Sequence, residues 1–152
     1  MPLSRVNWGL TPIVLTPIVL DTNIVLDVWV FADAAAVPLR EQLLGGQVTW
    51  LATAAMRSEL ERVLAYPKIV PRLDFYKTTQ QDVLAHFDQH AQLVEAAPKA
   101  PVTCSDADDQ IFIDLAVAHQ AVLLSKDQAV LSMQKRLLAL GVQARRAITL
   151  EA

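Results

Sequence analysis

Three aspartates stand where the ends of predicted secondary-structure elements can bring them together. Asp21 directly follows the apolar run 18–20, of which Ile18 and Val19 are β-branched, and Asp127 follows the apolar run 122–124 with two residues between. Asp109 lies in the first turn of a predicted helix. Ligands of open parallel sheets bind beyond the carboxyl ends of the strands, so we expect Asp21 and Asp127 at the functional edge of a sheet.

A glutamate from a fourth segment can complete this acidic group. Glu59 and Glu61 both lie on a helix predicted over 54–65. Residues two positions apart point about 200° apart around a helix, so only one of the two can face the pocket. The apolar residues beside them mark the core face of the helix without deciding which one does. Asp108 is a further candidate, as an auxiliary ligand next to Asp109.

Converging carboxylates need compensation by positive charge. Two carboxylates about 6 Å apart repel by roughly 2 to 3 kcal/mol at an effective dielectric constant near 20. Lys126 is the one basic residue within these local motifs. Mg²⁺ or Mn²⁺ is the natural counter-charge, because such hard cations prefer carboxylate and water oxygens. Ions of this kind activate water and stabilise a leaving oxygen, so the pattern favours phosphodiester hydrolysis.

Composition excludes several other classes of protein. With 152 residues, 53% hydrophobic and 19% charged, the chain is expected to be globular rather than disordered. A net charge of −3 argues against a protein that coats nucleic acid by neutralising phosphates. Cys104 is the single cysteine, which excludes an intramolecular disulfide and a cysteine-based zinc site. His86 and His90 would share one helix face, but a zinc site there lacks a neighbouring glutamate and a third ligand.

The sequence predicts no membrane-spanning segment. The apolar stretch Leu10–Leu20 is interrupted by Pro12 and Pro17 and is shorter than the roughly 20 residues that a spanning helix needs. It also lacks the basic flank and the cleavage site of a secretory signal. We therefore expect a soluble, cytoplasmic protein. With glycines at positions 9, 45, 46 and 141, the chain has no glycine-rich phosphate loop.

Strands and helices are predicted to alternate along the chain. Strands are expected over 18–20, 48–51, 121–124 and 142–150, with a short apolar segment at 93–94, and helices over 24–31, 37–44, 54–65, 78–91, 109–120 and 128–140. This alternation predicts a three-layer α/β/α domain with a mainly parallel sheet of about five strands. We expect an irregular lead-in over residues 1–16 and one domain over 17–152.

Three segments resemble the PIN-domain family, in particular the VapC-like ribonucleases that are toxins of bacterial toxin–antitoxin systems. They are Val-Leu-Asp-Thr-Asn at 19–23, Ser-Glu-Leu-Glu-Arg-Val-Leu at 58–64, and Asp-Ala-Asp-Asp at 106–109 with Leu-Ser-Lys-Asp at 124–127. The second string places the family's glutamate at Glu59, which is why we prefer Glu59 to Glu61. The family often has threonine where this chain has Ser125, a departure that keeps the hydroxyl group.

The resemblance implies more than the residue pattern does. It implies a PIN-like fold, catalysis and metal binding by Asp21, Glu59, Asp109 and Asp127, and dependence on Mg²⁺ or Mn²⁺. It also implies single-stranded RNA as substrate, an inhibitory antitoxin protein and a homodimer. Auxiliary roles in organising the pocket fall to Thr22 or Asn23 and to Ser125. Basic residues that could hold the RNA backbone are Arg57, Arg62, Lys68, Arg72 and Lys126.

Two other functions are compatible with parts of the pattern. An aspartate-based phosphotransfer domain would use Asp21 after its strand, but Asn23 stands where a second aspartate is expected, and Glu59 and Asp109 are left unexplained. An inactive PIN-like module would bind RNA or a protein without cleaving it. The presence of all four acids argues against this second reading, and metal binding would discriminate between the alternatives.

Overall fold

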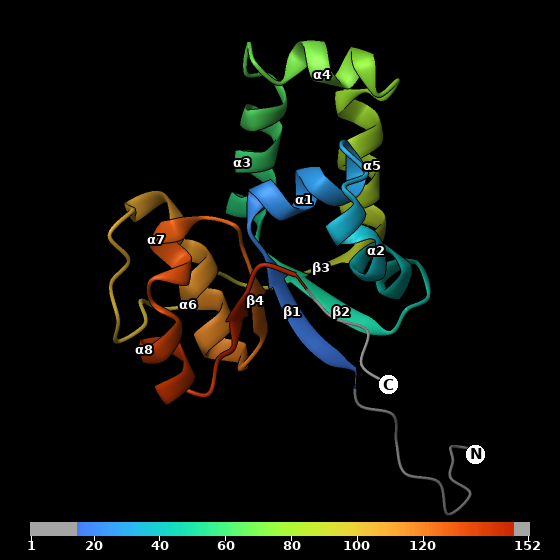
Figure 1. Ribbon diagram of the computed structural model, residues 1–152. Coiled ribbons are helices and arrows are strands. Elements are labelled where there is room, and N and C mark those ends of the chain that lie inside the picture. The colour runs from blue at the N-terminus through green and yellow to red at the C-terminus, as the bar shows by residue number, and fades with distance from the viewer. Residues whose placement is uncertain (1–14, 148–152) are drawn as a thin grey trace, which may run out of the picture.

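Five parallel strands form the centre of the molecule, in the order β3-β2-β1-β4-β5 (Figure 1). The computed structural model describes residues 15–147. The strands are β1 (Thr16–Leu20), β2 (Val48–Ala52), β3 (Ala91–Leu93), β4 (Val122–Leu124) and β5 (Ala144–Arg145). The prediction of an α/β fold with a five-stranded parallel sheet is therefore confirmed.

The central strand β1 comes from the second copy of a repeated pentapeptide, Thr-Pro-Ile-Val-Leu. Ile18 and Val19 are fully buried, and Leu20 is nearly so. Consecutive residues of a strand point to opposite faces, so burial of all three means that both faces of the sheet are covered. An unbroken apolar run suits that position, and β1 includes the strand predicted over 18–20.

Helices cover the sheet on both sides (Figure 1). The helices are α1 (Thr22–Trp29), α2 (Val37–Leu44), α3 (Ala54–Leu64), α4 (Val70–Phe75), α5 (Gln80–His90), α6 (Gln110–His119), α7 (Gln128–Leu131) and α8 (Gln134–Ala139), with 3₁₀ turns η1 (Ala34–Ala36) and η2 (Ala107–Asp109). Helices α6, α7 and α8 lie on one face, while α1, α2, α3 and α5 lie towards the other, where α4 caps the far ends of α3 and α5.

Several helix boundaries follow the local signals in the sequence. The Thr53 hydroxyl accepts a hydrogen bond from the Met56 backbone N–H at 3.3 Å, so Thr53 is the N-cap of α3 as predicted. Helix α2 ends at Leu44, before the glycine pair, and Gly46 has a φ of +68° that favours glycine. These caps fix where each helix meets its neighbouring strand.

The helices differ from the prediction in two places: one helix was missed, and one predicted helix is divided in two. Helix α4 was not predicted, because Pro67 and Pro71 punctuate this segment, although proline is tolerated in a first helical turn. The helix predicted over 128–140 is divided into α7 and α8. At the division the Ser132 hydroxyl donates to the Ala129 carbonyl at 3.0 Å, a local bond that competes with the helical pattern.

The last strand is shorter than expected and begins later. A strand was predicted over 142–150, whereas β5 comprises Ala144–Arg145. The end of the predicted strand, 148–150, lies outside the described residues, as does most of the predicted lead-in over 1–16. Within 15–147, no single helix is long and apolar enough to cross a membrane. Helix α1 and the stretch 34–44 pass that test only when joined, and they are bent by 98°.

The strand order creates a crevice at one point of the sheet. The chain passes from β1 outward to β2 and β3, then crosses to the other side of β1 to form β4 and β5. Strands β1 and β4 are therefore the neighbours at which the winding direction reverses. In open α/β sheets such a switch point, at the carboxyl ends of the strands, is where ligands bind.

The contact between α5 and the sheet is expected to contribute strongly to stability. Phe87 is 2% exposed and packs edge-to-face with Trp50 on β2, with ring centroids 5.1 Å apart. Phe87→Ala should lower the free energy of unfolding by about 3 to 5 kcal/mol, because it leaves a cavity in the core. Urea unfolding measures this. Phe75→Ala is the matched control, since that ring is 77% exposed, and an equal loss in both variants would contradict the assignment.

Candidate functional site

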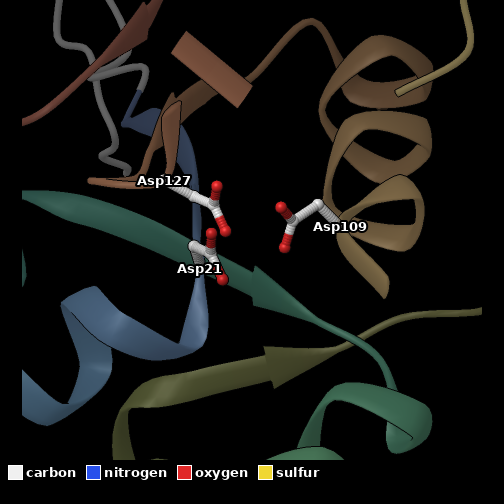
Figure 2. A group of neighbouring side chains, drawn as sticks. All are labelled: Asp21, Asp109 and Asp127. Carbon is white, nitrogen blue, oxygen red and sulfur yellow. The ribbon is translucent and has the colours of Figure 1, made fainter. Parts of the chain in front are cut away.

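Three carboxyl groups converge at the switch point of the sheet. Asp21 follows β1, Asp127 follows β4, and Asp109 ends the 3₁₀ turn that leads into α6. One carboxylate oxygen from each lies within 4.8 Å of the other two. Figure 2 shows the side chains of Asp21 and Asp127 pointing from the strand ends towards Asp109, which faces them from its helix. The structure thus brings together the three aspartates that the sequence singled out.

Two hydrogen bonds hold the Asp21 carboxylate in place. The buried Ser125 hydroxyl donates to Asp21 Oδ2 at 2.6 Å, and the Thr22 backbone N–H donates to Asp21 Oδ1 at 2.7 Å. The second bond makes Asp21 the N-cap of α1, so a single carboxylate both starts a helix and faces the crevice. Its backbone is fixed too, because Asp21 N–H donates to the Leu124 carbonyl at 2.9 Å.

The surroundings of Asp21 disfavour its charged form. Asp21 is 4% exposed, and burial raises its pKa to about 6. The bonds from Ser125 and Thr22 lower the pKa and oppose part of this rise, while the charges of Glu59 and Asp127 add to it. Asp21 is therefore a carboxylate whose charged form a nearby positive charge would stabilise.

The surroundings of Asp109 disfavour its charged form more strongly than those of Asp21 do. Burial raises the pKa of Asp109 to about 8, and the charge of Asp21 and contact with Asp127 add to the rise. Its Oδ2 atom is buried and has no hydrogen-bond partner among the described residues. A buried oxygen with no described hydrogen-bond partner, beside two other carboxylates, is suited to serve as a ligand of a cation.

The loop after β4 places Asp127 and connects it to the other strand end. Asp127 is half-buried and accepts from the Ala129 N–H at 3.0 Å as the N-cap of α7. Its own N–H donates to Ser125 Oγ at 3.0 Å, so this hydroxyl contacts both Asp127 and Asp21. Asn23 Oδ1 accepts from the Lys126 N–H at 3.3 Å, which ties α1 to the same loop. Asn23 and Ser125 thus position the carboxylates.

Of the two glutamates on α3, Glu59 is the one that faces the site. Glu59 is half-buried, and its carboxylate accepts a short hydrogen bond from the Thr22 hydroxyl, next to Asp21. Glu61 is exposed. Glu59 lines a cavity of about 470 Å³ together with Asp109 and the exposed Asp108. Glu59 and Asp108 therefore lie at the margin of the site, outside the group of three aspartates.

The structure shows an ion pair that the sequence did not indicate. Lys126 Nζ lies 2.6 Å from Asp27 Oδ2, and the Asp27 side chain is 7% exposed. Asp27 lies within an apolar helix and is 99 positions from its partner, so neither periodicity nor local motif could pair them. The charge of Lys126, next to Asp127 in sequence, is therefore directed to α1.

The remaining candidates have structural partners. His86 and His90 both stack on Trp29, with ring centroids 4.3 and 5.2 Å from the indole ring. Within residues 15–147 no third metal-ligating side chain completes a group with them. Cys104 is buried, and burial raises the pKa of its thiol above the usual value. These contacts leave the aspartate group as the candidate centre.

A divalent cation fits the donor set found here. Asp21, Asp109 and Asp127 offer carboxylate oxygens within 4.8 Å of one another, and the buried oxygen of Asp109 has no other described partner. Hard cations take such oxygens, and a dipositive ion would offset the repulsion among them. The cluster can therefore bind a metal ion.

The metal-free protein should lose stability as the pH rises. Folded Asp21 and Asp109 have pKa values of about 6 and 8, above the ordinary 3.8, so the folded state binds more protons between about pH 4 and pH 8. Their protonated forms stabilise the fold at low pH, and that stability disappears as they ionise. We expect a fall of roughly 3 kcal/mol or more across this range in EDTA. Asp109→Asn should flatten the profile, and urea unfolding that is insensitive to pH would contradict the assignment.

Removing the Ser125 hydroxyl should perturb Asp21 without removing a carboxylate. Ser125→Ala leaves Asp21 Oδ2 and the Asp127 N–H without their partner, which should cost about 1 to 3 kcal/mol of stability. The pKa of Asp21 should also rise further, as a carboxyl ¹³C titration by NMR would measure. Ser132→Ala is the matched control, since its hydroxyl bonds only locally. A pKa equal to that of the wild type would overturn this role for Ser125.

Comparisons with known proteins agree with this geometry. Residues 17–129 match the PIN domain. Among solved structures, the chain is similar to one chain in the crystal structure of VapBC2 from Rickettsia felis. In that structure VapBC2 is bound to a DNA fragment from its promoter. The likeness has a TM-score of 0.57 at 16% sequence identity and covers 85% of this chain and 98% of that one. A search of curated proteins gave no match. Because the family match spans well over half of its length, the chain belongs to the PIN domain family.

Proposed function

We propose that this protein is a metal-dependent endoribonuclease that cleaves single-stranded RNA. The observation that carries the proposal is the convergence of Asp21, Asp109 and Asp127 at the switch point of the sheet. Buried carboxylates that repel one another are a cost to the fold unless they serve a ligand. Membership of the PIN domain family and the acidic cluster together support a nuclease.

In this proposal each residue has a distinct task. Asp21, Asp109 and Asp127 would hold Mg²⁺ or Mn²⁺, which when bound supplies activation of water and neutralisation of charge on the phosphate. Ser125 orients the Asp21 carboxylate, and Thr22 orients Glu59 through its hydroxyl. Glu59 lies beside the cluster, where it would accept a proton or supply a further oxygen ligand to the metal ion. Burial excludes bulk water and strengthens each of these interactions.

We further propose that the protein is the toxin of a type II toxin–antitoxin pair. The support is the sequence resemblance to VapC-like toxins and the fold shared with a VapBC2 structure. On this proposal a small antitoxin protein, and in some states a second copy of the chain, would cover part of the surface. Co-expression with the product of a neighbouring reading frame, followed by co-purification and an RNA cleavage assay, tests the antitoxin proposal.

Replacing Asp21 should abolish cleavage while the fold persists. We expect wild-type protein to cleave single-stranded RNA with Mg²⁺ or Mn²⁺ and not with EDTA. Asp21→Asn should lower the rate by about a hundredfold or more, because it removes one anionic ligand at the switch point. Calorimetry with Mn²⁺ should show weaker binding by the same variant.

The control for this experiment is Asp74→Asn, an equal change at an exposed position of α4. It should cleave RNA and bind Mn²⁺ like the wild type. Cleavage that is equally fast in EDTA would overturn the metal dependence. A folded protein that binds Mn²⁺ but cuts no RNA in a broad sequence panel would favour a binding module, and one that binds no Mn²⁺ would overturn the whole acidic-pocket mechanism.

A further inference from the structure

A cavity of about 470 Å³ adjoins the aspartate cluster on the side of α3. Its walls come from α3 and the turn after it on one side and from the 3₁₀ turn before α6 on the other. The lining residues are Glu59, Arg62, Val63, Tyr66, Asp106, Asp108 and Asp109. Because Asp109 belongs to both the cavity and the cluster, a group bound here would lie next to the metal-binding carboxylates. We name it the Arg62–Tyr66 cavity.

The two walls of this cavity differ in charge. The wall before α6 presents Asp106, Asp108 and Asp109, which repel a phosphate. The wall on α3 carries one acidic residue, Glu59, and presents Arg62 and the phenol ring of Tyr66, with the half-buried Val63 between them. A polyanion entering the cavity would therefore run along the α3 wall.

Arg62 is distinguished from the other basic residues near the site by its contacts. Arg57 forms a bidentate pair with Asp88 at 2.7 and 2.9 Å, and the guanidinium of Arg72 lies 3.8 Å from the ring centre of Phe31. Lys126 pairs with Asp27, as described above. Arg62 forms no ion pair with any residue of the described chain, and it lines the cavity. It is the cation best placed to accept a phosphate there.

Tyr66 offers an aromatic surface at the same cavity. It is 48% exposed, so part of the ring is accessible to a ligand. Its backbone is fixed on both sides, because its N–H donates to the Val63 carbonyl at 3.0 Å and Pro67 follows it. Its carbonyl accepts from the N–H groups of Ile69 and Val70. The ring is thus presented from a rigid turn.

We propose that Arg62 and Tyr66 bind the nucleotide adjacent to the scissile phosphate, with its base stacked on the Tyr66 ring and its phosphate on the Arg62 guanidinium. This inference rests on the proposed ribonuclease function. Stacking on an aromatic ring requires an unpaired base, so the site selects single strands over duplexes and tolerates every base. The cavity volume falls within the range of roughly 300 to 1,000 Å³ that small-molecule sites occupy, enough for one nucleotide.

The experiment compares Tyr66→Ala, Tyr66→Phe and Arg62→Gln with wild type. The probe is a fluorescein-labelled single-stranded RNA of mixed sequence. Binding is measured by anisotropy with Mg²⁺ in an Asp21→Asn background, which blocks cleavage, and KM and kcat are measured in the native background. Tyr66→Ala should weaken RNA binding and raise KM by about tenfold, whereas Tyr66→Phe should bind like wild type because the ring remains. Arg62→Gln should weaken binding and reduce its salt dependence by about one released ion.

Matched controls separate this site from general surface effects. Phe75→Ala removes an exposed ring of α4, and Arg136→Gln removes an exposed guanidinium of α8, on the opposite face of the sheet. Both should bind RNA like the wild type. Calorimetry should give the same Mn²⁺ affinity for Tyr66→Ala as for wild type, which establishes that the aspartate cluster is intact. A duplex of the same sequence should bind wild type and Tyr66→Ala equally weakly.

The outcomes distinguish failure of this inference from failure of the proposed function. If wild type cleaves RNA with metal while Tyr66→Ala and Arg62→Gln keep wild-type binding and KM, the nuclease stands and this nucleotide site is wrong. Tyr66→Phe binding as weakly as Tyr66→Ala would overturn the stacking role. If wild type neither binds nor cleaves RNA, the proposed function and this inference both fail.

Discussion

The mutual repulsion of three clustered carboxyl groups, two of them buried and one half-buried, is the constraint to which the rest of this structure responds. Asp21 and Asp109 are 4% and 6% exposed, and their raised pKa values record how poorly the protein alone supports their ionised forms. The fold offsets part of this cost by placing Asp21 and Asp109 at the N-terminal ends of α1 and α6, where the helix dipole favours negative charge. Ser125 contributes a hydrogen bond, and a bound cation could offset the remaining repulsion.

Much of the site was predictable because, in a parallel sheet, the residues that follow neighbouring strands lie at the same edge of the sheet. An aspartate after a central strand and another after its neighbour must meet at one edge, which correctly joined Asp21 and Asp127. The choice of Glu59 over Glu61 needed the family resemblance, since helical spacing alone only separates the two. The Asp27–Lys126 pair could not be predicted, because nothing local links residues so far apart in the chain.

The fold class was also predictable from the sequence, because the order of strands and helices limits how they can pack. Alternating strands and helices imply a parallel sheet, and the observed sheet has five parallel strands with helices on both faces. Errors occurred where short-range signals conflict. Two prolines concealed α4, which uses one of them in its first turn, and a single serine hydroxyl divides α7 from α8. Strand β5 is only two residues long, too short for any alternating pattern to mark its limits.

Because the chain is synthesised from its N-terminus, the three aspartates of the acidic centre become available at different times during translation. Ser125 and Asp21 are 104 positions apart yet share a hydrogen bond, and β4 must insert beside β1 before that bond forms. A nascent chain synthesised as far as α5 carries Asp21 and Glu59 but neither Asp109 nor Asp127. The first 126 of the 152 residues must therefore be translated before the third aspartate of the group exists, so the acidic centre is completed late in the synthesis of the chain.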